Sequence, residues 1–112
     1  MTRRTLAEMT GGWIAGDFDP TCLRTRAVEV ACKHYAAGDA EGAHVHRVAR
    51  EITLVASGRA VMNGLVLTAG DIVILEPGEA ADFAAIEPTI TVVVKSPSVP
   101  GDKYPAVPGV RA

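Results

Sequence analysis

The sequence has few aromatic residues, few cysteines and little net charge. Aromatic residues make up 4% of its 112 residues, so it lacks the stacking platforms that single-stranded nucleic acids need. Lys and Arg number 11 against 13 Asp and Glu, a formal net charge of −2. No basic patch is therefore expected for the phosphates of nucleic acids or for anionic lipids. We expect neither nucleic acid nor a membrane as a partner.

Cysteine and long apolar runs are also scarce. Cys22 and Cys32 are too few for a disulfide framework and do not form a CxxC zinc motif, so we expect two reduced, buried thiols. Arg3 and Arg4 are not followed by an apolar stretch of signal-peptide length, and no run approaches the length that spans a membrane. We therefore expect a cytoplasmic protein.

The segments that are present read as short strands. Apolar or alternating stretches bounded by turn residues predict strands over 26–35, 43–48, 51–56, 60–62, 65–67, 72–75 and 89–95. The continuous aliphatic run at 72–75 indicates a buried strand. Asn63-Gly64 predicts a hairpin turn, because both positions tolerate positive φ. Turn signals every 8–12 residues or so, with no long amphipathic helix between them, indicate an all-β antiparallel sandwich or barrel.

One domain with two flanking segments is expected. The N-terminal lead-in covers 1–25, the barrel 26–96, and a proline-rich, extended tail 97–112. Trp13 and Ile14 supply apolar material for docking on the barrel or on a second subunit. We expect a homodimer, formed through an edge strand or an exchanged N-terminal segment.

The candidate functional residues gather around a His-x-His pair. On a strand, His44 and His46 project from the same face, where two imidazoles can chelate one ion of Zn, Cu, Fe or Ni. Glu51 lies an odd number of residues beyond His46, so it reaches the same ion only if the chain bends or bulges near Ala49. His34 shares its face with Val30 and Cys32, and we expect this apolar face to point inward. His34 is either a hydrogen-bonded core histidine or a pocket residue that acts as a general base.

The spacing of these residues resembles the cupin superfamily. Gly38, His44, His46, Glu51 and Gly58 match every anchor of the first cupin motif. Gly70-Asp71, the following aliphatic strand and Pro77 resemble the second motif, but Asp82 stands where we place that motif's histidine. The resemblance covers 26–95 and implies a small double-stranded β-helix (jelly-roll) barrel.

The resemblance also implies a divalent metal (Fe, Mn, Zn or Ni) on His44, His46, Glu51 and Asp82. Either Asp82 replaces the histidine, or the site is degenerate and holds metal weakly or not at all. The expected pocket wall is aliphatic and comprises Val48, Thr53, Val55, Met62, Ile74 and Phe83.

Two functions follow from this resemblance. The first is a metal-dependent enzyme, a dioxygenase-type oxidoreductase or an isomerase, acting on a small oxygenated metabolite, with His34 moving protons. The second is a binding or accessory module that does not turn over a substrate. A structural dimer with a vestigial site differs from this module only in having no ligand. An open coordination position on the metal would favour the enzyme, and a closed set of four protein ligands would favour a structural site.

Overall fold

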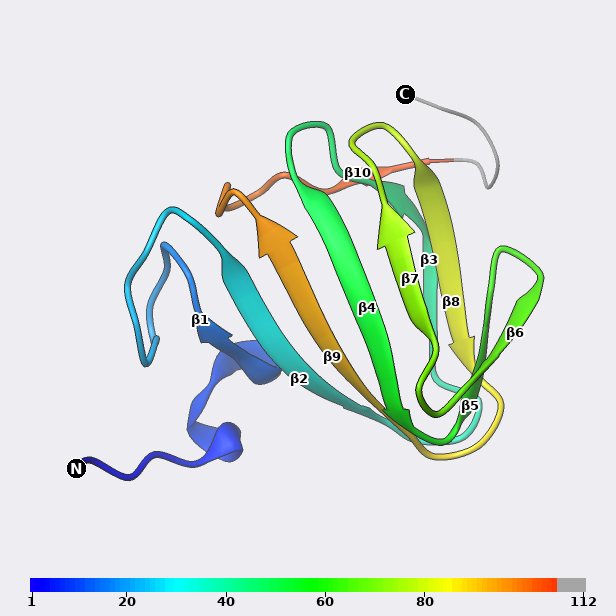
Figure 1. Cartoon of the computed structure of the whole chain (residues 1–112), viewed down its shortest axis with the longest axis horizontal. Coiled ribbons are helices and arrows are strands. Elements are labelled where there is room, and N and C mark those ends of the chain that lie inside the picture. Colours follow the sequence, from blue (N-terminus) through cyan, green and yellow to red (C-terminus); the bar gives the residue numbers. More distant parts are fainter. Residues whose placement is uncertain (107–112) are drawn as a thin grey trace.

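Two antiparallel β-sheets face each other in the computed structural model, which describes residues 1–106 (Figure 1). Across those residues, the first sheet has the order β1 (Trp13–Ala15), β2 (Glu29–Tyr35), β9 (Thr89–Ser96), β4 (Arg50–Ser57), β7 (Ile72–Leu75). The second has the order β10 (Tyr104–Pro105), β3 (Ala40–Val45), β8 (Ala80–Ala85), β5 (Arg59–Met62), β6 (Leu65–Thr68). The arrangement confirms the expected all-β antiparallel jelly roll.

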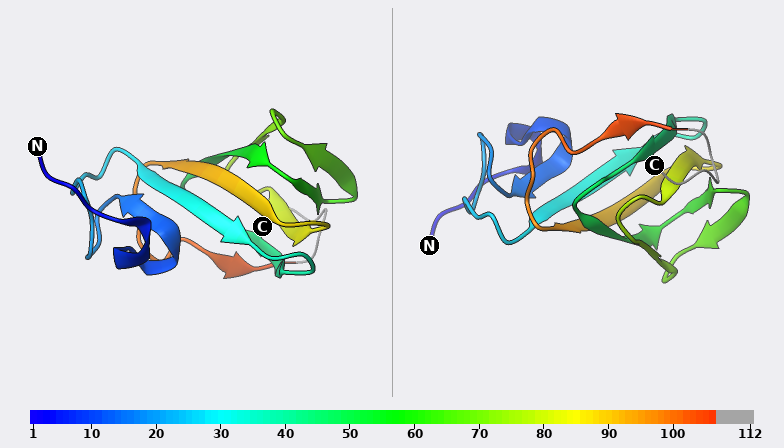
Figure 2. Two further views of the ribbon diagram at one scale, coloured as in Figure 1. Left: turned by 90° about the horizontal axis from the view of Figure 1, so that it is seen from below. Right: turned by 90° about the horizontal axis from the view of Figure 1, so that it is seen from above.

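The flanking segments contribute strands of their own. Two short 3-10 helices, η1 (Leu6–Glu8) and η2 (Thr10–Gly12), precede β1, which pairs with β2 at the edge of the first sheet. Strand β10 pairs with β3 at the edge of the second sheet. The N-terminal segment and the β5–β6 hairpin lie at opposite ends of the molecule (Figures 1 and 2). Neither helix in residues 1–106 is long or apolar enough to cross a membrane.

The hairpin turn has the backbone that its sequence predicts. Asn63 and Gly64 both adopt positive φ, 49° and 77°, between the paired strands β5 and β6. Gly58 also has positive φ, and a Cβ there would lie 2.3 Å from the carbonyl oxygen of Pro88, so only glycine fits between β4 and β5.

The apolar core lies between the sheets, where inward residues of β4 to β8 meet. Its buried members are Val55, Ala60, Met62, Leu67, Leu75, Ala81, Phe83 and Ala85. In β8 these inward positions alternate with outward ones, so Ala81, Phe83 and Ala85 share the inner face.

Strand β2 has its polar face inside. Glu29 and Ala31 are buried and Lys33 and Tyr35 line the interior, whereas His34 is exposed on the opposite face. The expectation that the apolar face of this strand points inward is therefore wrong.

The strand at 72–75 is likewise not buried as expected, because Ile72 and Ile74 are 61% and 56% exposed on the outer face of the first sheet. The thiols also differ from expectation, since Cys22 is exposed and Cys32 is half-buried.

Candidate metal centre

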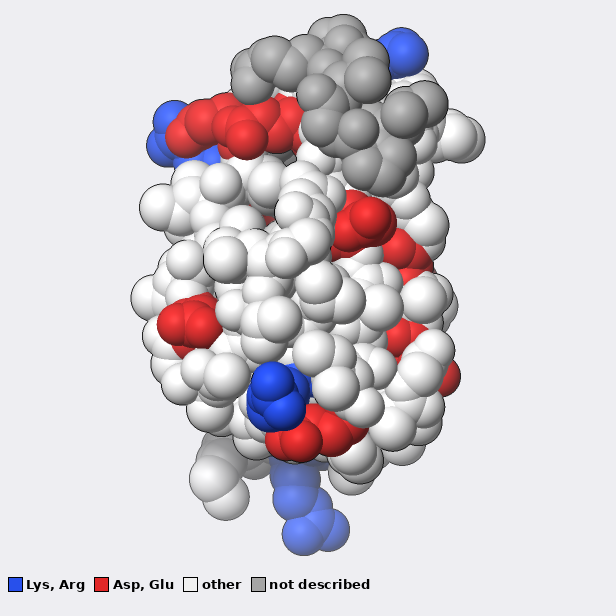
Figure 3. Space-filling view, turned by 90° about the vertical axis from the view of Figure 1, so that its right-hand side faces the viewer, with Lys and Arg blue, Asp and Glu red and all other residues white. Residues whose placement is uncertain are grey.

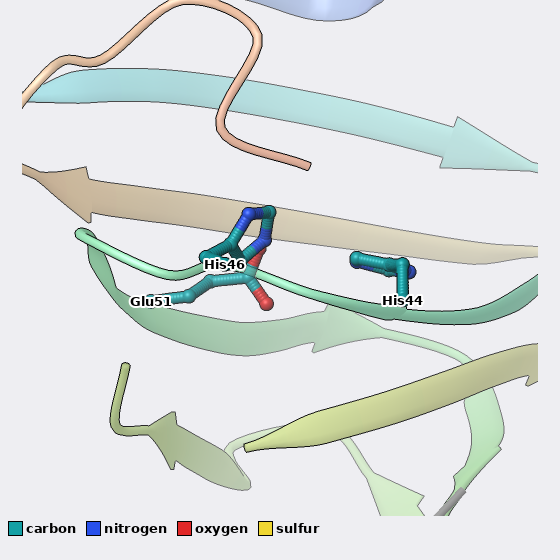
Figure 4. Close-up of side chains that lie close together, drawn as sticks. All are labelled: His44, His46 and Glu51. Atoms are coloured by element: carbon teal, nitrogen blue, oxygen red, sulfur yellow. The ribbon is translucent and has the colours of Figure 1, made fainter. Parts of the chain in front are cut away.

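Three of the expected ligands come together between the two sheets. One ligand atom from each of His44, His46 and Glu51 lies within 4.8 Å of the other two. His44 is the second-last residue of β3, His46 directly follows the strand, and Glu51 is near the start of β4 (Figure 4). The chain turns from the second sheet to the first over residues 46–49, so Glu51 faces back toward the histidines. This turn is the bend that the odd spacing of Glu51 requires.

A bulge in β3 orients His44. Glu41 pairs with Phe83 and His44 pairs with Ala81. Between these two pairs β3 advances by three residues, whereas β8 advances by only two. The extra residue lets both Glu41 and His44 face the interior despite their odd separation.

Each imidazole is held by a backbone carbonyl. The Nδ1 of His44 contacts the carbonyl oxygen of Gly42 at 3.1 Å, and the Nδ1 of His46 makes a short hydrogen bond to the carbonyl oxygen of Asp102. A carbonyl only accepts, so each Nδ1 carries the hydrogen and donates it. In the neutral ring the lone pair then lies on Nε2, which is the atom that a metal takes.

The Nε2 of His46 has no hydrogen-bond partner among the described residues, although the side chain is almost fully buried. Its nearest charged neighbour is Oε1 of Glu51 at 3.3 Å, without hydrogen-bond geometry. A buried nitrogen acceptor beside a carboxylate is costly unless something binds it. The donor set and this unpaired atom therefore fit a divalent cation.

The electrostatics of the group favour its metal-binding forms. Burial lowers the pKa of His44, which keeps the imidazole neutral. Burial alone would raise the pKa of Glu51, but its contact with His46 and its electrostatic interactions with His46, His44 and Lys95 lower it, so the carboxylate stays ionised.

A buried aspartate shapes the turn that carries His46. The carboxylate of Asp102 accepts the backbone N–H groups of Arg47 (2.8 Å), Val48 (3.1 Å) and Ala49 (2.9 Å). Sequence reasoning missed Asp102, because it lies in the segment 97–112 that we expected to be an extended tail. Residues 107–112 of that segment fall outside the described part of the chain. A single Asp in a Gly-Asp turn gives no signal that its carboxylate caps a loop more than fifty residues away.

Asp82 does not join the group. Its carboxylate accepts the backbone N–H of Asn63 at 2.8 Å, and its own N–H donates to Oδ1 of Asn63 at 3.0 Å. The residue that faces the histidines is Ala81, which is buried and pairs with His44. Asp82 comes one step later on the strand and points the opposite way, so its expected ligand role is not met here.

His34 is also remote from the group. It is exposed, on the outer face of β2, and its Nε2 lies 4.0 Å from Sγ of Cys32. It lines the open hollow beside the N-terminal segment and not the cavity at His44 and Glu51, so a proton-transfer role at the candidate metal ligands has no support from its position.

The interior cavity beside the ligands is small, about 30 Å³. Of the expected wall residues, Thr53, Met62 and Phe83 line it, and Val55 lies in the adjoining core. Val48 and Ile74 are instead more than half exposed. The remaining lining is more polar than expected and comprises Lys33, Tyr35, Glu41, His44, Glu51, Thr91 and Val93.

An open hollow of about 570 Å³ adjoins the cavity. It lies against the N-terminal segment and is lined in part by Leu6, Gly11 and Gly12. Lys33, Tyr35 and Glu41 line both spaces, and Lys33 Nζ lies 3.4 Å from Oε1 of Glu41. Glu41 and His44 also line a second open hollow, of about 410 Å³, beside β10.

Comparison with known proteins gives structural relatives. No family model and no curated protein matches the sequence. A conserved protein with a double-stranded β-helix domain from Klebsiella pneumoniae is 34% identical, with a TM-score of 0.66 over 73% of this chain and 72% of that one.

Two more distant structures share the fold. An RmlC-like cupin from Shewanella frigidimarina is 22% identical, with a TM-score of 0.60 over 67% of this chain and 70% of that one. The DMSP lyase DddQ from Ruegeria pomeroyi is 17% identical, with a TM-score of 0.71 over 87% of this chain and 51% of that one. The chain therefore belongs to the proteins with a double-stranded β-helix domain, and it shares its fold with cupins.

Proposed function

We propose that this chain is a metal-dependent enzyme that acts on a small oxygenated molecule. The observation that carries the proposal is the convergence of His44, His46 and Glu51, with the buried Nε2 of His46 unpaired. Two imidazoles and one carboxylate match the ligand set of non-haem iron, and the same donors also accept manganese, nickel or zinc.

The chain leaves room for a substrate at this site. Ala81, opposite His44, offers no donor atom, so the three protein ligands leave coordination positions open. Open positions distinguish catalytic from structural metal sites. A divalent metal held here supplies Lewis acidity toward a substrate oxygen or, if it is iron, access to dioxygen chemistry.

Other side chains of the cavity orient the substrate. Burial and the nearby Glu41 carboxylate raise the pKa of Tyr35, so its phenol stays protonated and can donate a hydrogen bond to a substrate oxygen. The hydroxyl of Thr91 is buried without a partner among the described residues and lines the same cavity. We assign these two hydroxyls to substrate positioning.

The structural relatives do not define a reaction for this chain. One structure with this fold is named as a lyase, but at 17% identity it shows the fold alone. Our proposal keeps two reaction classes, a dioxygenase-type oxidation and an isomerisation, because both need an open metal position beside a dry pocket.

A ligand-binding module without turnover is the second candidate, and one observation favours it. The cavity of about 30 Å³ is far below the 300–1,000 Å³ of ordinary ligand pockets. In that case the larger hollow beside the N-terminal segment binds the ligand, and the metal only anchors one end of it.

Turnover by metal-loaded protein separates the two candidates. Protein loaded with iron, manganese, nickel or zinc is screened for oxygen consumption and for isomerisation of small hydroxy acids, diketones and aldoses. We expect turnover that falls by about 10³-fold or more in His44→Ala, because the metal supplies the chemistry. Asp82→Asn, at a residue that bonds to Asn63 outside the cavity and the hollow, is the matched control and should behave as the wild type. Ligand binding without turnover would favour the second candidate, and turnover that survives in His44→Ala would contradict the proposal.

A further inference from the structure

Lys33 lies where the interior cavity at the metal ligands adjoins the open hollow beside the N-terminal segment, and it lines both spaces. Its side chain is only 20% exposed. The bond to Glu41 uses one of the three N–H donors of the ammonium, and no other hydrogen bond to Nζ forms among the described residues. Two donors therefore remain free for a ligand that offers acceptor oxygens.

Two neighbours fix the position of this ammonium. Its Nζ lies 5.2 Å from the centre of the Trp13 ring on β1, and its partner Glu41 comes from β3 in the facing sheet. A cation–π contact and an ion pair thus hold Lys33 from two sides. A side chain that is already ordered loses less entropy when it binds a ligand.

The charges that line the cavity suit an anion once a metal is held there. Lys33 offsets Glu41, so Glu51 leaves one negative charge among the described lining residues. A divalent cation on His44, His46 and Glu51 changes this to one net positive charge. An uncompensated charge in a buried site is costly, and a ligand with one negative charge removes it.

The sizes of the two spaces determine how such a ligand lies. The cavity of about 30 Å³ admits only about one or two heavy atoms, so a single carbonyl or hydroxyl group reaches the metal ligands. The hollow of about 570 Å³ is within the range of ordinary ligand pockets, and Leu6 and Ala7 give its wall an apolar part. A short carbon chain fits the hollow, and an acidic group on it lies next to Lys33.

Other basic groups are placed less well for this purpose. Lys103 lines the second open hollow together with Glu41 and His44, but it does not line the cavity. Figure 3 views the side of the molecule opposite the N-terminal segment and shows mostly uncharged surface, with scattered acidic groups and basic groups toward its upper and lower ends. The described residues visible there form no basic cluster that would compete for an anion.

We propose that the substrate of this site is a small oxo or hydroxy acid with one carboxylate, and that Lys33 binds the carboxylate. The inference rests on the proposed function and narrows it, because it selects acids over neutral diketones and aldoses. The carboxylate accepts hydrogen bonds from the free donors of Lys33, while the substrate's carbonyl or hydroxyl oxygen faces His44 and Glu51. Glu41 stays beside the ammonium and opposes the second negative charge.

Calorimetry with paired probes tests the substrate class on the zinc-loaded full chain. Pyruvate, acetoacetate and levulinate carry the carboxylate at increasing distances from a ketone, and the methyl ester of each keeps the ketone but removes the charge. We expect at least one acid to bind about tenfold or more tightly than its ester, because a hydrogen bond to a charged group is the stronger one. Zinc-loaded protein that prefers none of the acids would overturn the carboxylate inference alone. Protein that holds no zinc would contradict the proposed function instead.

Substitutions test the assignment to Lys33. In Lys33→Met the preference for the acid should fall below about threefold, and Lys33→Arg should retain most of it, because only the charge differs in kind between the two. Lys103→Met is the matched control and should bind as the wild type does. A preference that survives in Lys33→Met but is lost in Lys103→Met would place the carboxylate in the second hollow and overturn the assignment.

Glu41→Gln tests the same contact in the opposite direction. The variant removes the negative charge that opposes the ligand, so acid binding should tighten about threefold or more while ester binding stays unchanged. A gain of this kind does not arise from a damaged fold. Equal or weaker acid binding in Glu41→Gln would show that the carboxylate does not lie beside this ion pair.

Discussion

Ala81 lies directly opposite His44 in the β3–β8 ladder, with its side chain buried on the same inner face. A ligand introduced there would reach the ion from β8. We expect Ala81→His to tighten the binding of nickel or zinc at least tenfold, which corresponds to about 1.4 kcal/mol. Isothermal titration of metal-free protein measures the constant.

Asp82→His is the matched control for this variant. Its side chain points to the outer face, where Asp82 now bonds to Asn63. We expect no gain in metal affinity from it. Tighter binding by Asp82→His than by Ala81→His would show that the strand has the opposite orientation.

The hydrogen bonds from the turn after His46 to the carboxylate of Asp102 predict that one substitution lowers both stability and metal affinity. Asp102→Asn replaces one acceptor oxygen with a donor that opposes backbone N–H groups. We expect a loss of about 2 kcal/mol in unfolding free energy, because hydrogen bonds to a charged group are broken. Metal affinity should fall roughly tenfold or more, since the same turn orients His46. Asp39→Asn, which changes an exposed turn contact to Ala36, is the control that should leave metal affinity unchanged.

The contribution of Asp102 to stability should depend on pH. Burial alone would raise the pKa of its carboxyl, but the backbone N–H groups of Ala49, Arg47 and Val48 outweigh burial and lower it below 3.8. A group whose pKa is depressed by folding stabilises the fold above its unfolded pKa and loses that effect as pH falls through the folded value. Urea denaturation should therefore show a constant gap between wild type and Asp102→Asn above about pH 5 and a shrinking gap below pH 3.8. A gap that persists unchanged to pH 2 would contradict the assignment.

Lys95 compensates two buried carboxylates. Its Nζ lies 3.4 Å from Oε1 of Glu29, and its strand position pairs with both Glu29 and Glu51. We expect Lys95→Met to cost about 3 kcal/mol, because it leaves buried acids without their cation. Adding Glu29→Gln should restore part of that loss. Equal stability of Lys95→Met and wild type in urea denaturation would show that the acids are hydrated.

The convergence of His44, His46 and Glu51 was the most predictable part of the candidate site. His44 and His46 are two residues apart, and strand periodicity places them together whatever the surrounding fold. Glu51 followed once a bend was assumed. The position facing them from β8 was not predictable in the same way, because the Ala-rich run 80–85 has low strand propensity and no strand was expected there. Without that strand, nothing distinguished Ala81 from Asp82.

His34 was misplaced for a different reason. Alternation identified the two faces of β2 correctly, but the apolar face was assumed to point inward. In this fold the inner face of β2 carries the charged residues of the cavity, and the outer face carries Val30 and Cys32. Hydrophobic periodicity separates the two faces of a strand, but it does not say which of them lines the interior of the barrel.

Metal content of purified, untagged protein tests the central claim most directly. Wild type and His34→Ala should each hold close to one equivalent of a divalent metal by elemental analysis, and the His44→Ala/His46→Ala double variant should hold none. Protein that remains metal-free after incubation with iron, manganese, nickel and zinc, or a double variant that retains its metal, would contradict a metal centre on these histidines.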